Sequence, residues 1–137
     1  MLGEQYAELK GKITSQRVLD AEGPSLETSV SVSGTMKGVK VQELITFVGM
    51  PTSEKGIIHG IGRGVIMVAG GEEPEMVTYT GEGIGRVSSA GNIKWCGSTF
   101  FRKSSGDKLA FLNNILGVFE SEIGTDGNFS EKAWEWK

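Results

Sequence analysis

The chain has 137 residues, a length typical of one compact domain, so we expect a single domain spanning residues 1–137. Lys and Arg number 14 against 17 Asp and Glu, and the net charge of −3 argues against nucleic-acid binding, which needs a basic surface. The single cysteine, Cys96, excludes an internal disulfide and fits a reducing compartment, where we expect it to be a small buried residue.

The first residues do not resemble a targeting signal. The segment MLGEQYAELKGK mixes charged and apolar residues and lacks the apolar core of a secretory signal peptide. Every run of apolar residues is much shorter than a membrane-spanning helix requires. We therefore expect a cytoplasmic protein with no membrane span.

Apolar residues recur mainly at every second position, which is the period of a β-strand. In residues 26–33, for example, Leu, Thr and Val alternate with Glu and Ser. Turn signals rich in Gly, Pro, Asn and Asp separate such segments. Consecutive antiparallel strands lose their exposed edges when they close on themselves, so we expect an all-β fold, an eight-stranded antiparallel up-and-down barrel. The expected strands are roughly 10–20, 26–33, 39–47, 57–68, 76–88, 92–103, 116–124 and 129–136.

Three of these strands carry glycine at alternate positions, namely Gly60, Gly62 and Gly64, then Gly81, Gly83 and Gly85, then Gly97. Dinucleotide-binding proteins also contain a G-x-G pattern, but there a helix begins directly after the glycines. Strand-like residues follow both repeats here, which argues against a phosphate-binding loop. Because glycine is unfavourable inside a strand, this concentration needs a structural or functional reason.

Hairpin pairing predicts that the glycines share one face of the sheet. The pairs expected across the first hairpin are Gly60 with Gly85, Gly62 with Gly83, Gly64 with Gly81 and Arg63 with Glu82. In the next hairpin we expect the indole of Trp95 to cover Gly85. Most apolar and aromatic residues of these strands lie on the glycine face, so we assign that face to the interior. Two interpretations stay open: tight curvature with packing beneath aromatic rings, or the floor of a ligand cavity.

Only residues 107–115 have a helical pattern, which predicts a short helix of at most two turns. Asp107 is a candidate for its N-cap. Its apolar residues Leu109, Leu112 and Ile115 are expected to plug one mouth of the barrel.

The last hairpin is expected to turn at Asp126 and Gly127. This turn places Phe119 opposite Trp134 and assigns both rings to the interior. The other face then carries Glu120, Glu122, Glu131 and Glu135. Because neighbouring carboxylates repel one another unless they are solvated, we expect that face to lie outside.

The segment SSGDKL at residues 104–109, the strand start GVFE at 117–120 and the turn at 126–128 resemble the closing part of allene-oxide-cyclase-type barrels and of calycin-like relatives. The resemblance covers the closing quarter of the chain. It implies an eight-stranded antiparallel barrel with a central cavity, often oligomeric. Allene oxide cyclase rearranges an oxidised fatty acid in that cavity, mainly by positioning it. None of that family's functional residues matches a position in this chain.

The ring-rimmed glycine face predicts an interior site for a small, largely apolar molecule. The residues expected to form it are Tyr79, Trp95, Thr99, Phe101, Phe119 and Trp134. No catalytic residue can be assigned from the sequence, and no metal or cofactor is expected, because the motifs that hold them are absent.

Two alternative functions stay open. An isomerase or cyclase acting by confinement needs a polar group inside the barrel, and the candidates are Tyr79, Thr99, Glu27 and Arg17. Arg17 and Glu27 are more simply explained as a cross-strand pair on the surface. An oligomeric structural barrel needs an exposed apolar surface, for which Phe47, Val48 and Met50 are candidates.

Overall fold

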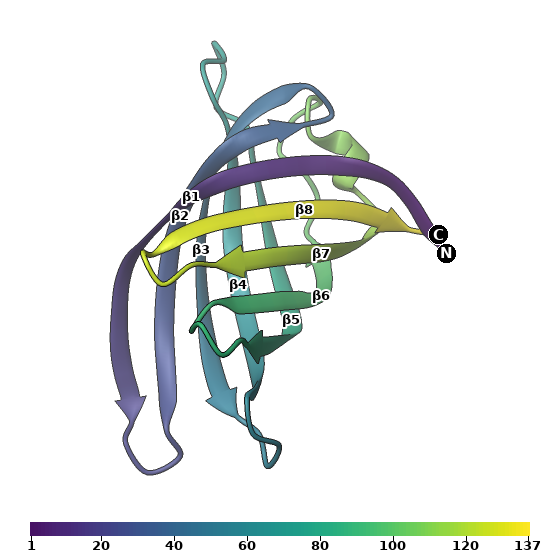
Figure 1. Ribbon diagram of the computed structural model, residues 1–137. Helices are drawn as coiled ribbons and strands as arrows, with labels where there is room; N and C mark the ends of the chain where they lie inside the picture. Colours follow the sequence, from purple (N-terminus) through teal and green to yellow (C-terminus); the bar gives the residue numbers. More distant parts are fainter.

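The alternation of apolar and polar residues produces eight strands, each paired antiparallel with the next in chain order. The computed structural model describes residues 1–137, and pairing of the last strand with the first closes the barrel (Figure 1). The predicted all-β barrel is therefore confirmed, although its first strand begins earlier than expected. The strands are β1 (Leu2–Asp20), β2 (Ser25–Met36), β3 (Val39–Pro51), β4 (Ile57–Val68), β5 (Met76–Val87), β6 (Ile93–Phe101), β7 (Leu116–Ile123) and β8 (Asn128–Trp136).

The two-residue period separates the inside of the barrel from the outside. In β2, Val30 and Val32 are buried while Ser31 and Ser33 between and beyond them are exposed. Each fully buried valine contributes roughly 1.5–3 kcal/mol through loss of apolar surface from water. On β6, Trp95 is buried, whereas Cys96 points outward and is exposed. The expectation that Cys96 is buried was wrong because it occupies an outward position of its strand.

The expected helix at residues 107–115 is only a 3-10 turn, η1 (Ala110–Leu112). No side chain caps it, so Asp107 is not an N-cap. The buried carboxylate of Glu75 instead accepts the N–H of Leu109 at 2.7 Å, which anchors the segment to the chain before β5. Leu109 and Leu112 are completely buried in the core, as the plug interpretation expected.

No helix with the length and apolar character that a membrane crossing requires is present in the structure.

The β4–β5 register differs from the expected one by two residues. Gly60 faces Gly83, and Gly64 faces Tyr79. A shift of two residues leaves every side chain on its expected face. It places the ring of Tyr79 against Gly64, where a side chain would leave it no room. The expected register of β5 with β6 is confirmed, with Gly85 opposite Trp95.

The same shift removes one predicted charge pair. Arg63 pairs with Thr80 on the outer face, and Glu82 pairs with Ile61. Glu82 lies instead near His59, whose Nε2 is 3.9 Å from the carboxylate. The favourable Arg63–Glu82 pairing was therefore predicted wrongly.

The β7–β8 register differs from the expected one by a single residue, which reverses the faces of β8. Phe119 faces Ala133, while Trp134 faces Val118. The connection has three residues rather than two, since the N–H of Gly124 donates to the Asn128 carbonyl at 2.9 Å. Gly127 takes a φ of +85°, the left-handed residue typical of three-residue hairpins. A one-residue change moves all side chains of a strand to the opposite face.

Two corrections follow from this change of face. Trp134 is on the outer side of the barrel, not the inner one as expected. Glu131 lines the interior, and Glu135 pairs with the inward-facing Gly117. The expectation that all four glutamates of this hairpin face solvent was therefore wrong for these two.

Candidate binding site inside the barrel

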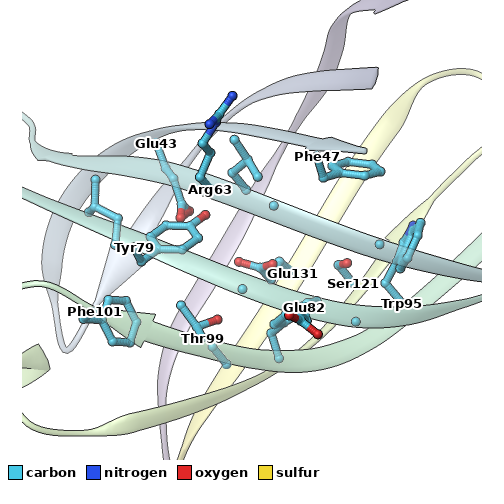
Figure 2. Close-up of a pocket in the computed structure, with 18 of the residues that line it drawn as sticks. Glu43, Phe47, Arg63, Tyr79, Glu82, Trp95, Thr99, Phe101, Ser121 and Glu131 are labelled. Atoms are coloured by element: carbon cyan, nitrogen blue, oxygen red, sulfur yellow. The ribbon is translucent and has the colours of Figure 1, made fainter. Parts of the chain in front are cut away.

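A cavity of about 80 Å³ lies on the inner side of the glycine-bearing strands. Five of the six predicted site residues line it, namely Phe119 and the four labelled in Figure 2, Tyr79, Trp95, Thr99 and Phe101. The sixth, Trp134, does not. β4, β5 and β6 supply one wall, the neighbouring strands β3 and β7 extend it, and β1, β2 and β8 contribute the remaining lining residues.

The glycines provide room for aromatic rings. A Cβ atom at Gly60 would lie 2.6 Å from the ring of Trp95, and one at Gly97 would lie 2.8 Å from Phe119. Such separations are far inside van der Waals contact. Phe47 packs edge-on against Trp95, with ring centroids 5.4 Å apart. The rings occupy most of the space that the glycines leave free, and the cavity is the remainder.

Glu43 places a carboxyl group in an interior walled largely by apolar and aromatic residues. It stands on the inward face of β3 and is only 2% exposed. Its Oε2 atom has no hydrogen-bond partner, and its carboxylate lies beside the Tyr79 hydroxyl (Figure 2). Burial raises the pKa of Glu43 to about 7, although hydrogen bonding with Tyr79 opposes part of this rise.

A second carboxylate, Glu131 on β8, faces the same cavity. Burial, and then the nearby charge of Glu43, raise the pKa of Glu131 well above its ordinary value. Burial, and then the charges of the neighbouring glutamates Glu43 and Glu131, raise the pKa values of the Tyr6 and Tyr79 hydroxyls. Both phenols therefore stay protonated. The interior therefore combines two carboxyl groups with two phenol donors.

Further polar groups line the cavity without carrying charge. The hydroxyl residues Thr99 and Ser121 are both buried. The indole Nε1 of Trp95 is buried and has no hydrogen-bond partner. Buried polar atoms in folded proteins are nearly always paired, so the unpaired atoms mark Glu43 and Trp95, which both line the cavity, as candidates for binding water or a ligand.

Among solved structures, the crystal structure of a protein with unknown function from Clostridium acetobutylicum ATCC 824 is similar to this chain, with a TM-score of 0.75. The two share 13% sequence identity over 98% of each chain. This likeness shows a shared barrel fold and nothing about function. A scan against protein-family models and a search of curated proteins found no match. The resemblance to allene-oxide-cyclase-type barrels therefore stays a prediction.

Two of the polar residues considered for an interior role, Arg17 and Glu27, lie on the surface. They form an ion pair of 3.1 Å, with Arg17 largely exposed.

The apolar surface expected from Phe47, Val48 and Met50 loses its aromatic member. Phe47 lines the cavity and packs against Trp95, so it does not contribute to an exposed patch.

Sequence reasoning missed Glu43, Glu131 and Tyr6 as interior residues. Glu43 carried a usable signal, because it stands in the apolar phase of the alternation Val39, Val41, Glu43, Ile45, Phe47. Glu131 was concealed by the one-residue error in the last hairpin. Tyr6 precedes the expected start of the first strand, so no face was assigned to it.

Proposed function

We propose that this barrel binds a small, largely apolar molecule in its interior. The observation that carries the proposal is that two residues lining a cavity walled by aromatic rings, Glu43 and Trp95, each hold a buried polar atom with no hydrogen-bond partner. A ring-lined cavity with few polar groups is the usual form of a small-molecule site. An engineered cavity of about 150 Å³ holds benzene, so a cavity of about 80 Å³ suits a ligand of only a few heavy atoms.

The test is a ligand titration that is monitored by NMR at the indole N–H signals. Small alcohols, amines and aromatic compounds are titrated into the protein labelled with ¹⁵N. We expect a bound ligand to shift the Trp95 signal while leaving the outward Trp134 signal unchanged. Trp95→Phe assigns the signal.

A cavity-filling variant separates interior binding from surface binding. Ser121 is buried and lines the cavity, so Ser121→Leu fills the space and should abolish the shifts. The matched control is Ser33→Leu, because Ser33 is exposed on the outer face of β2. Shifts that persist in Ser121→Leu, or no binding by any compound, would contradict the proposal.

A second candidate function is an isomerase or cyclase that works by proton transfer in the confined interior. The pairing of Glu43 with Tyr79 favours it, because a carboxyl group with a pKa of about 7 can accept and return a proton near neutral pH. Tyr79 would stabilise a developing oxyanion through its hydroxyl.

Deuterium exchange tests this second function. A small ketone is incubated with the protein in D₂O, and incorporation next to the carbonyl is measured by mass spectrometry. We expect faster exchange with the unmodified protein than with Glu43→Gln. Equal exchange rates in the two would rule out Glu43 as a proton acceptor.

A further inference from the structure

The ionisable side chains that face the cavity are all acidic. Glu43 and Glu131 point into it. The only basic residue at its wall is Arg63, whose side chain is exposed and points away from the interior (Figure 2). Glu82 also belongs to the outer face, where it lies near His59. The two interior carboxylates thus have no positive counterpart in the protein.

The unpaired carboxylate oxygen is an independent sign of a missing partner. Only 2% of the surface of Glu43 is exposed, and its Oε2 atom accepts no hydrogen bond. Without a cation beside it, a buried carboxyl group holds its proton to higher pH, as the raised pKa values of Glu43 and Glu131 indicate. An ammonium group at this position would stabilise the ionised form, which a neutral apolar ligand cannot do. A ligand carboxylate would place a third acidic group beside these two and would offer neither of them an opposite charge.

We infer that the interior ligand is a small organic cation, a primary amine with a short apolar chain. Its ammonium group lies at Glu43 and Glu131. Its apolar part lies against the glycines of β4 and β5, among the aromatic rings. This inference rests on the proposed function and specifies the class of ligand. Aromatic rings also attract a cation through their faces, so the walls favour the same chemistry. The cavity of about 80 Å³ limits the chain to a few carbons.

Three ligand series with the same alkyl chains and different head-group charges test the charge preference. The unbranched amines from methylammonium to hexylammonium, the corresponding alcohols and the corresponding carboxylates are titrated at pH 8. At this pH the ligand amines are protonated and the ligand carboxylates are ionised. We expect a short amine to bind at least tenfold more tightly than its alcohol, and the carboxylates not to bind.

Matched variants assign the preference to the interior carboxylates. In Glu43→Gln and in Glu131→Gln we expect the amine to bind no more tightly than the alcohol, while alcohol binding persists. The control is Glu120→Gln, since Glu120 is exposed on the outer face of β7, and it should keep the full preference. Thermal unfolding shows whether each variant is folded, and the series with the unmodified protein needs no variant at all.

The outcomes separate this inference from the proposed function. Equal binding of amines and alcohols, or tighter binding of carboxylates, overturns the cation inference and leaves interior binding standing. Failure of all three series to bind overturns interior binding itself. An amine preference that survives in both interior variants overturns the assignment to Glu43 and Glu131.

Discussion

Individual glycines in this barrel act by leaving space for rings. Gly60 and Gly85 both lie against the indole of Trp95, which is itself held by the ring of Phe47. The conformations of these two glycines are ordinary for a strand, because neither has a positive φ. Replacing either one therefore tests packing and not backbone strain.

Gly60→Ala should destabilise the protein. The added Cβ would lie 2.6 Å from the Trp95 ring, which has little freedom to move, and overpacking of this kind costs about 1–3 kcal/mol of unfolding free energy. Urea denaturation measures the change. Gly71→Ala is the control, because its nearest neighbour would be 3.4 Å away, and it should change stability little. Equal stability of the two variants would contradict the packing role of Gly60.

The buried carboxyl of Glu43 should make stability depend on pH. Its pKa is about 7 in the folded protein, against an ordinary value of 4.5, so the folded state retains the proton to higher pH than the unfolded chain does. The contribution of Glu43 to the unfolding free energy should therefore fall as pH rises from about 4.5 towards 7 and level off above. The slope is about 1.4 kcal/mol per pH unit for each such proton.

Glu43→Gln should remove part of this pH dependence. Urea denaturation from pH 5 to pH 8 measures the slope in both proteins. A residual slope is expected, since burial and Glu43 also raise the pKa of Glu131. The exposed Glu120→Gln should leave the slope unchanged. A slope in Glu43→Gln identical to that of the unmodified protein would show that Glu43 does not titrate in this range.

At the scale of elements, the three-residue turn before β8 decides which of its side chains face inward. Phe129 and Ala133 are buried in the core, and Trp134 lies outside. We expect Phe129→Ala to cost about 3–5 kcal/mol of unfolding free energy, as for a large core ring. Trp134→Ala should cost only about 1 kcal/mol. Chemical denaturation compares the two, and a larger loss for Trp134→Ala would mean that the inner face carries Trp134 after all.

At the scale of the whole molecule, closure brings the two ends of the chain together. The Met1 ammonium donates to the carbonyl of Lys137 at 2.6 Å, and the termini lie side by side (Figure 1). Pairing of β1 with β8 closes the sheet as far as Lys12, and the remainder of β1 pairs with β2 alone. Closure thereby removes most of the open edge at which sheets aggregate.

A circular permutant should therefore fold. Met1 and Lys137 are joined by a short Gly/Ser linker, and the chain is opened between Glu72 and Glu73 in the exposed β4–β5 loop. We expect the far-UV circular dichroism spectrum and cooperative unfolding to persist, because no strand is cut. Opening the chain after Gly81, inside β5, is the control and should prevent folding. Loss of structure in the first permutant would contradict the closed arrangement of the ends.

The sequence by itself determined the eight strands, the inward glycine face and most of the rings around the cavity. It could do so because the two-residue period is local and survives register shifts of two residues, as between β4 and β5. Only the tertiary structure decided the partner of Gly64, the direction of Trp134 and the meeting of Glu43 with Glu131. Those features depend on loop length and on strands far apart in the sequence, where one additional turn residue exchanges the two faces.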